Sequence, residues 1–231
     1  MIVKECGASI LRQMPRKKLK HFGEMKTWTH VLEPDLPGRF DLKTANTCQG
    51  TWGEKVILEL GCGRGTYTVA LAERLPEAHL VGVDLKGARL WHGGKTAMEL
   101  GLSNVTFLRS HIQALPAFFA PEEVDEIWIT FPDPHPTEGN ERRRLTSPRF
   151  LELYSPLLKK GGRVHLKTDN EALFRYSVQS FEGMGFEQEL IHWDLHKEAP
   201  EDSMLRRVRT QYEEIYLKKG QPIFFVSVKK P

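Results

Sequence analysis

From residue 55 to the C-terminus, short apolar runs alternate with stretches whose apolar residues recur at helical spacing. The runs expected to form strands are residues 56–60, 79–84, 105–110, 125–131, 163–169, 186–193 and 222–229. Strands that are separated by helices usually form a mainly parallel sheet with helices on both of its faces. This alternation limits the possible folds more than any other feature, and it predicts an α/β fold with a seven-stranded, mainly parallel sheet.

The helices between the strands follow from the same spacing. They are expected within residues 66–76, 87–101, 147–162 and 170–185. For the third of these, Ser147 is the predicted N-cap and Pro148 the first helical residue, because serine and proline favour these positions. Gly161 and Gly162 are expected to end it.

Residues 1–53 have no sustained period and contain many turn-forming residues. We expect a basic, largely irregular N-terminal extension with room for one short helix, followed by a single domain over residues 54–231. A basic cluster of the extension lies within nine residues that contain no acid, and its members are Arg12, Arg16, Lys17, Lys18 and Lys20.

The composition is that of a globular protein, with 40% hydrophobic and 27% charged residues in a chain of 231. No apolar run approaches the roughly 18–20 residues that a membrane span needs. The N-terminal basic residues follow the apolar stretch, which is the wrong order for a secretory signal. Cys6, Cys48 and Cys62 indicate neither a disulfide framework nor a metal site. We therefore expect a cytoplasmic protein without a metal.

The net charge of +3 is too small to indicate a nucleic-acid partner by itself. Basic residues nevertheless gather in two further clusters, Arg142–Arg144 with Arg149, and Arg206 with Arg207 and Arg209. Each cluster alone fits a solvated face. Three clusters in a nearly neutral chain favour a polyanionic partner.

In folds of this kind, ligands bind at the carboxyl ends of the strands. The polar residues expected to meet there are Gly61–Gly65, Asp84, Ser110, His111, Asp133, Thr168 and Asp169. One rim of the sheet is thus predicted to carry the functional site.

The segment "ELGCGRG", residues 59–65, follows the first predicted strand. Its three glycines allow a tight turn and the close approach of a ligand, and Asp84 lies where an acid can bind a ribose. Dinucleotide sites have a third glycine at the position that is Thr66 here. The G-x-G-x-G spacing instead resembles the S-adenosylmethionine site of the Rossmann-like, seven-stranded class I methyltransferases. A purely structural turn is the alternative.

Asp133 lies between two prolines in "FPDPHP", residues 131–136, directly after an apolar run. Pro132 and Pro134 restrict the backbone on either side, so the carboxylate is expected to have a fixed direction. The arginines at 142–144 follow and are suited to binding phosphates. The alternative is an ordinary solvated loop.

Four further motifs follow "FPDPHP" in the chain: "RRRLTSPRFLELY", "HLKTDN", "LFRYS" and "TQYEEIYLKKGQPI". Together the five resemble the bacterial, single-chain tRNA (guanine-N7)-methyltransferase family. The resemblance extends from about Val56 to Pro222 and does not include the first 50 residues. It implies methyl transfer from S-adenosylmethionine to N7 of a guanosine in the variable loop of tRNA, and it leaves both a monomer and a homodimer open.

The resemblance also implies roles for individual residues, with Asp133 as the catalytic one. The implied cofactor-binding residues are Glu59, Gly61, Gly63, Gly65, Asp84, Ser110, His111 and Asp133. The implied substrate-binding residues are Thr137, Arg142, Arg143, Arg144, Asp169, Thr210, Tyr212 and Glu213.

Three positions depart from the family pattern. His135 replaces the usual tryptophan between the prolines, and Thr137 replaces a lysine that the family uses on its substrate. His111 stands where an acid is usual after the third strand, and it is not a permanently charged acceptor. These departures bear more on the substrate than on the cofactor.

Several residues have structural interpretations beside the functional ones. Glu59 also fits an acid that satisfies backbone donors, Asp169 a helix cap, and Tyr212 a half-buried core aromatic. His192 and His196 are four residues apart, but strand and loop are expected there, so this spacing does not predict a metal site.

A core position with its hydrogen bonds made is expected for His165, which lies within a predicted strand.

Three other functions also remain open. The first is an N-methyltransferase for another RNA base or a small amine, and the second is a noncatalytic RNA- or cofactor-binding module. The third is a nicotinamide oxidoreductase, which Thr66 disfavours.

Overall fold

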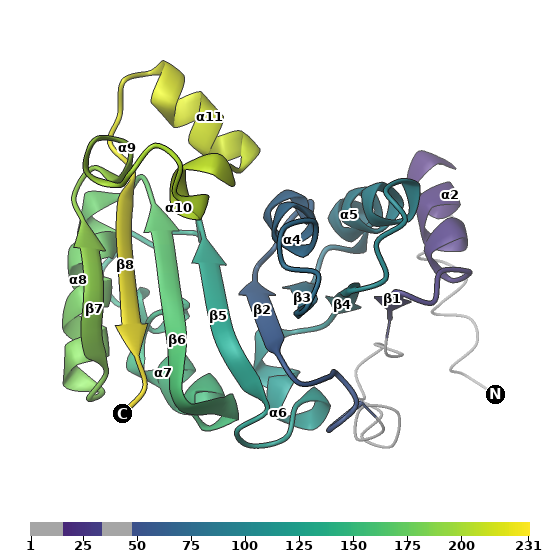
Figure 1. Cartoon of the computed structure of the whole chain (residues 1–231), viewed down its shortest axis with the longest axis horizontal. Helices are drawn as coiled ribbons and strands as arrows, with labels where there is room; N and C mark the ends of the chain where they lie inside the picture. Colours follow the sequence, from purple (N-terminus) through teal and green to yellow (C-terminus); the bar gives the residue numbers. More distant parts are fainter. Residues whose placement is uncertain (1–15, 34–47) are drawn as a thin grey trace.

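A computed structural model describes residues 16–33 and 48–231, with side chains from Leu19 onward, and it shows an eight-stranded sheet (Figure 1). The strands are β1 (Val31–Leu32), β2 (Val56–Leu60), β3 (His79–Asp84), β4 (Val105–Arg109), β5 (Val124–Thr130), β6 (Leu158–Thr168), β7 (Glu187–His192) and β8 (Phe224–Lys229). Their order is β1-β4-β3-β2-β5-β6-β8-β7, and only the pairs formed by β8 are antiparallel. The predicted α/β fold is confirmed.

The N-terminal segment contributes to this sheet. β1 pairs in parallel with β4, and the preceding helix α2 (Arg16–Met25) packs against α5 (Gly87–Glu99). The boundary expected between an extension (residues 1–53) and a domain (residues 54–231) therefore separates β1 from the other strands of the same sheet. Arg12, Cys6 and the side chains of residues 16–18 lie outside the described residues.

Helices cover both faces of the sheet. The remaining helices are α4 (Thr66–Ala72), α6 (Leu115–Phe118), α7 (Pro148–Tyr154), α8 (Glu171–Gly183), α9 (Leu195–Glu198), α10 (Met204–Arg207) and α11 (Gln211–Lys218). Side chains alternate between faces along a strand, so Ile57 of β2 packs with the core of α4 and α5 whereas Leu58 packs with that of α6, α7 and α8.

The helix predicted over residues 147–162 is shorter than expected. α7 ends at Tyr154, a 3₁₀ turn covers Ser155–Leu157, and β6 begins at Leu158. Pro156 explains this boundary, because a proline disfavours helical geometry in the residue before it. Ser147 lies at the N-cap position, but its hydroxyl donates to the Arg142 carbonyl, 3.3 Å away, instead of capping the helix.

The segment between β7 and β8 carries α9, α10 and α11 over the carboxyl ends of β5 and β6 (Figure 1). Lys167, near the end of β6, attaches this segment by donating hydrogen bonds to the carbonyls of Leu205 and Val208 at 2.8 and 3.2 Å. The C-terminal part of the chain thus forms a cap beside the strand ends. Of the helices in residues 16–33 and 48–231, none has the length and apolar character to cross a membrane.

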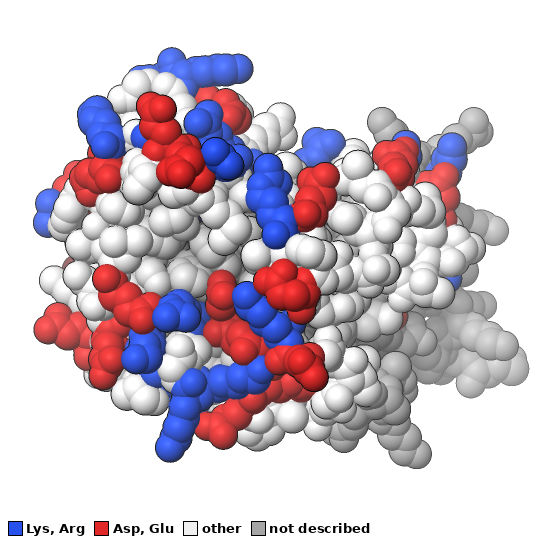
Figure 2. All heavy atoms as spheres, in the orientation of Figure 1, with Lys and Arg blue, Asp and Glu red and all other residues white. Residues whose placement is uncertain are grey.

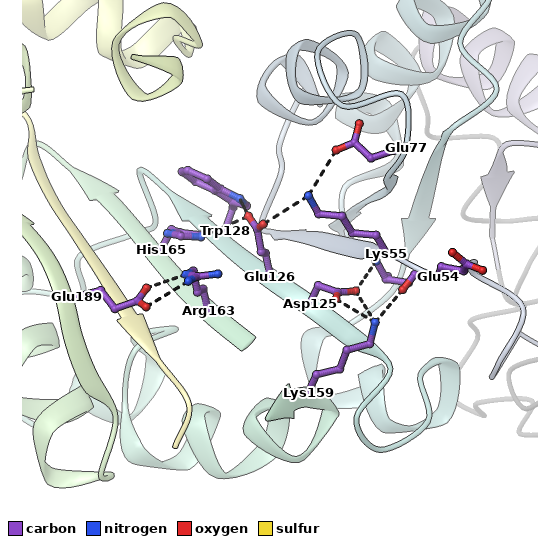
Figure 3. A network of polar contacts seen from close by, with 11 residues as sticks. Glu54, Lys55, Glu77, Asp125, Glu126, Trp128, Lys159, Arg163, His165 and Glu189 are labelled. Carbon is purple, nitrogen blue, oxygen red and sulfur yellow. Dashed lines mark hydrogen bonds and ion pairs between the residues drawn. The ribbon is translucent and has the colours of Figure 1, made fainter. Parts of the chain in front are cut away.

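The charged residues are mixed over the surface. Lysine and arginine are interspersed with aspartate and glutamate on the face drawn in Figure 2. Near the amino ends of β5 and β6, the Lys159 ammonium lies 2.8 Å from Asp125 and 2.7 Å from the Glu54 carbonyl (Figure 3). These contacts tie the start of the sheet together on the side opposite to the strand ends that carry the predicted site.

Candidate active site

A cavity of about 320 Å³ lies at the carboxyl ends of the strands. Its lining comes from the glycine turn after β2, the start of α4, the loop after β5, the residues after β6, and α11. A second hollow of about 310 Å³ adjoins it and is lined by Asp84, Ser110 and His111. Gly61 and Asp133 line both. The structure thus brings most of the predicted strand-end residues to one rim.

The glycine turn is held closely against β3. Backbone N–H groups of Gly61 and Cys62 donate to the Val83 carbonyl at 2.8 and 3.0 Å. Gly65 has φ of +71°, and a Cβ there would collide with the ring of Phe107. Glycine is therefore required at this position both by the backbone conformation and by packing.

Asp84 fixes the shape of this turn. Its Oδ2 accepts from the Gly63 N–H at 3.0 Å, and its Oδ1 accepts from the Lys86 N–H at 2.7 Å. Each carboxylate oxygen has further acceptor capacity. The same side chain can thus hold the turn and accept hydrogen bonds from the hydroxyls of a ribose.

Glu59 lies beneath the turn and is only 3% exposed. One oxygen accepts from the Thr130 hydroxyl at 2.7 Å and the other from the Thr68 hydroxyl. Burial raises the pKa of Glu59 to about 7, although both threonine hydrogen bonds act in the opposite direction. A backbone hydrogen bond from Thr68 acts on Glu59 as well, which agrees with the structural interpretation of an acid that accepts from backbone donors. It also lines the cavity.

The loop that carries Asp133 has an unusual backbone. Phe131 has φ of +48° and His135 has φ of +42°, both in the left-handed region that residues other than glycine rarely occupy. The Phe131 N–H donates to the Lys167 carbonyl of β6 at 2.8 Å. Asp133 is exposed between these two positions. The prolines are therefore one of several features that fix its direction.

Arg144 supports this loop from below. Its Nε donates to the Pro134 carbonyl at 3.0 Å, and its Nη2 donates to the His135 carbonyl at 3.2 Å. The guanidinium lies 4.3 Å from the ring centroid of Tyr176, and the residue is only 9% exposed. The structure thus directs two donors of Arg144 into the protein, and the phosphate-binding role expected for this residue stays a prediction.

The C-terminal motif separates into cavity-lining and buried residues. Thr210 caps α11, its hydroxyl accepting from the Glu213 N–H at 3.0 Å, and it also lines the cavity. Tyr212 is 57% exposed and lines the cavity, so it is not a core aromatic. Glu213 is fully buried, with Lys167 Nζ at 2.9 Å and His196 Nε2 at 2.8 Å. The Glu213 side chain is thus enclosed by its two partners, and the substrate contact expected for it stays a prediction.

Asp169 lines the cavity at the end of β6. It does not cap α8, because Asn170 is the N-cap and its Oδ1 accepts from the Leu173 N–H at 2.8 Å. Burial raises the pKa of the neighbouring Tyr216, and the charge of Asp169 raises it further. The Asp169 carboxylate is thus placed toward the cavity, facing the tyrosines of α11.

Comparison with known proteins agrees with this geometry. The family described as "Putative methyltransferase" matches residues 53–226. The tRNA (guanine-N(7)-)-methyltransferase of Christiangramia forsetii is 39% identical over 225 residues, which cover 93% of this chain and 98% of the relative. The protein of the same name from Porphyromonas gingivalis is 40% identical over 210 residues, covering 88% and 85%. The chain belongs to the tRNA (guanine-N7)-methyltransferase family.

The fold is shared with more distant proteins. The chain matches a solved "Antibiotic Related Methyltransferase" with a TM-score of 0.60 at 17% sequence identity, covering 86% of this chain and 98% of that one. At this identity the likeness concerns the fold alone. It supports the predicted class I methyltransferase architecture.

The cofactor of this methyltransferase family is S-adenosylmethionine, and the residues around the glycine turn fit it. Gly63 has no atom closer than 4.0 Å to where a Cβ would stand, so its backbone is open to a ligand. The buried Tyr67 hydroxyl lines the same cavity and has no hydrogen-bond partner among the described residues. A bound ligand with polar groups could contact the open backbone of the turn and supply the missing hydrogen-bond partner of the Tyr67 hydroxyl.

The other residues implied by the family resemblance are spread over the rim. Ser110 is buried and donates to the His111 carbonyl at 3.2 Å, whereas His111 is exposed. Arg143 lines the second hollow. Thr137 and Arg142 are exposed, and they line neither the cavity nor the second hollow.

Sequence reasoning missed several residues of the methyltransferase site. Lys86 and Arg89 line both hollows, and Tyr67 and Tyr216 line the cavity. The two cations lie within five residues after Asp84 in the sequence, so the strand-end rule could have found them. Tyr67 belongs to a helix that no motif marked, whereas Tyr216 lies within "TQYEEIYLKKGQPI", of which only Thr210, Tyr212 and Glu213 were assigned a role.

The histidines do not form a metal site. His192 Nδ1 lies 3.2 Å from Glu198, and His196 contacts Glu213. No group of three or more metal-binding side chains occurs among residues 16–33 and 48–231. His165 is buried against Trp128, and its Nε2 lies 3.4 Å from Glu126. Glu126 is thus the polar partner of Nε2 in this core histidine, whereas Nδ1 has no hydrogen bond within the described structure.

Proposed function

We propose that the protein transfers the methyl group of S-adenosylmethionine to N7 of a guanosine in tRNA. The observation that carries this proposal is the position of Asp133, which borders both the cavity over the glycine turn and the hollow that contains Asp84. A base held by this carboxylate would lie directly beside the bound cofactor.

The chemistry requires little beyond alignment. When bound, S-adenosylmethionine supplies an electrophilic methyl group on a positively charged sulfur. N7 of guanine has an in-plane lone pair and no proton, so no general base has to act first. The N7–carbon bond forms as the carbon–sulfur bond breaks, the bonding electrons remain on sulfur, and the positive charge moves to the purine. Orientation of this kind can lower a barrier by several kcal/mol.

Asp133 is suited to select guanine. An ionised carboxylate has two acceptor oxygens and no donor, which matches the N1–H and amino group on one edge of guanine. Adenine has no proton on N1 and cannot form this pair of hydrogen bonds. Asp133 and Asp169 both line the cavity, and their negative charge would stabilise the purine as it becomes cationic.

We infer the finer features of the substrate from the family resemblance. The target guanosine would lie in the variable loop, and the basic residues of α2 and of positions 142 and 143 would contact phosphates. The reaction would take place in the cytoplasm, where unmodified tRNA is available. The proposal is compatible with a monomer and with a homodimer.

The test is incubation of unmodified tRNA with methyl-labelled S-adenosylmethionine, followed by mapping of 7-methylguanosine. Asp133→Ala should lose at least 100-fold in turnover while its affinity for S-adenosylmethionine stays within a few-fold. Glu138→Ala, an exposed acid in the same loop, is the matched control and should remain active. An Asp133→Ala variant that keeps more than half of the rate would exclude this assignment.

The same experiment separates the other functions. Label on another base, or on a small amine, would indicate a different N-methyltransferase. Binding of tRNA without release of S-adenosylhomocysteine would indicate a noncatalytic module. Binding of NADH in place of S-adenosylmethionine would indicate an oxidoreductase.

A further inference from the structure

Two cations at the start of α5 have no assigned role. Lys86 is the N-cap residue of α5, and Arg89 lies in its first turn. Both side chains are exposed, and both line the cavity and the second hollow. Neither forms a side-chain hydrogen bond or ion pair with any other described residue.

Three other arginines near the site are engaged with the protein. Arg109 forms an ion pair with Glu33 at 2.8 Å, Arg64 lies 3.1 Å from His92 Nδ1, and Arg144 supports the Asp133 loop. Because these guanidinium groups are already paired, they are poor candidates for a mobile anionic ligand. Lys86 and Arg89 are free to contact one.

A third cation lines the same hollow as this pair. Arg143 also lines it, and its side chain forms no hydrogen bond or ion pair within the part of the chain that is described. Asp133 lies in the lining too. The carboxylate proposed to hold the guanine is thus bordered by Lys86 and Arg89 from the β3–α5 segment and by Arg143 from the segment before α7.

We propose that Lys86 and Arg89 form a phosphate subsite, which binds the phosphodiester of the nucleotide chain beside the target guanosine. This inference rests on the proposed function and names the contact that positions the RNA strand. Both side chains are exposed at the opening, where a phosphate can be neutralised while it remains partly hydrated. The deep end of the cavity is formed by buried residues such as Glu59 and Tyr67, and no phosphate has to enter it.

The test is the double variant Lys86→Gln/Arg89→Gln. Binding of unmodified tRNA, measured without S-adenosylmethionine, should weaken about 10-fold or more at moderate salt. The slope of log K against log salt should fall by roughly one to two, because about two phosphate contacts are lost. S-adenosylmethionine affinity, measured by calorimetry, should change less than 3-fold.

The matched control is Lys160→Gln/Lys229→Gln, which removes the same charge at the amino-end edge of the sheet. Its salt slope should stay within experimental error of the wild type. The charge-preserving variant Lys86→Arg/Arg89→Lys should keep most of the slope, which a merely structural role would not require.

Two results would overturn the phosphate subsite. One is a large loss of S-adenosylmethionine affinity with an unchanged salt slope, which would assign the cations to the carboxylate of the cofactor. The other is a slope equal to that of the control variant. The phosphate subsite is tested by tRNA binding alone, without turnover. If the wild type formed no 7-methylguanosine, the proposed function would be rejected, and the salt slope would still decide the phosphate subsite.

Discussion

At the scale of single residues, Arg144 has the clearest link between structure and reactivity. The loop of Asp133 includes two non-glycine residues with positive φ, and such conformations cost about 1 kcal/mol or more each unless the surroundings enforce them. Arg144 supplies part of that enforcement through hydrogen bonds to the carbonyls of Pro134 and His135. Its charge therefore supports the loop geometry that directs Asp133.

We predict that Arg144→Gln lowers the rate of methyl transfer about 10- to 100-fold, because a loosened loop misaligns Asp133. The salt slope of tRNA binding should remain that of the wild type, since this guanidinium is buried. Single-turnover rates and binding isotherms measure the two effects separately. Arg142→Gln, at an exposed neighbouring position, is the control. It should lower the salt slope of tRNA binding and leave the single-turnover rate near that of the wild type.

Arg144→Lys should recover only part of the rate, because an ammonium cannot reproduce the two-pronged geometry of a guanidinium. If Arg144→Gln flattened the salt slope and left the rate unchanged, the residue would be a phosphate contact after all.

At the scale of secondary-structure elements, α11 depends on a buried ion pair. This helix contributes Gln211, Tyr212 and Tyr216 to the cavity, and Glu213 holds it against Lys167 of β6. Burial lowers the pKa of Lys167, whereas the charge of Glu213 acts against that change. Removal of one partner from such a pair leaves the other buried without compensation.

We predict that Glu213→Gln lowers the free energy of unfolding by about 3 kcal/mol near neutral pH. The deficit should decrease as pH rises, because Lys167 without its counter-charge can lose its proton. Urea unfolding at several pH values measures both effects. Glu214→Gln changes a half-buried residue paired with Arg209 at 3.2 Å, and it should cost less than about 0.5 kcal/mol. Equal effects of the two variants would contradict an anchoring role for Glu213.

The elements also show what the sequence could predict. Short apolar runs identified strands β2 to β8, and apolar residues at helical spacing identified α4, α5, α7 and α8, because these signals depend on neighbouring residues. The short helices α6, α9 and α10, and also α11, were not predicted. β1 is only two residues long and exists through its pairing with β4, so no local pattern marks it. The buried state of Glu213 depends on Lys167, which is 46 residues away, and could not be inferred from a motif.

At the scale of the whole molecule, two apolar layers enclose a sheet whose polar groups gather at one end. The strand-end rule predicted the positions of Asp84, Asp133 and Asp169 because topology alone determines them. It did not distinguish cations that face the opening, such as Lys86, from Arg144, which faces inward. That difference depends on side-chain packing, which the order of the strands does not specify.

Glu59 connects this architecture to pH. In the unfolded chain a glutamate ionises near pH 4.5, whereas burial raises the pKa of Glu59 to about 7 in the folded protein. Between these values the unfolded state releases its proton first, so the free energy of unfolding falls as pH rises and levels off above about pH 7. At about 1.4 kcal/mol for each pKa unit, the loss is on the order of 3 kcal/mol.

We predict that Glu59→Gln removes this loss, because a glutamine has no proton to release in this range. The difference in unfolding free energy between Glu59→Gln and the wild type should therefore increase by about 2–3 kcal/mol from pH 4.5 to pH 8. Urea unfolding without S-adenosylmethionine measures it, and subtraction cancels the groups that the two proteins share. Glu99→Gln, an exposed acid at the end of α5, should follow the wild type at every pH. Parallel curves for Glu59→Gln and the wild type would mean that Glu59 ionises in the folded protein near the same pH as in the unfolded chain, and that the threonine hydrogen bonds offset the effect of burial.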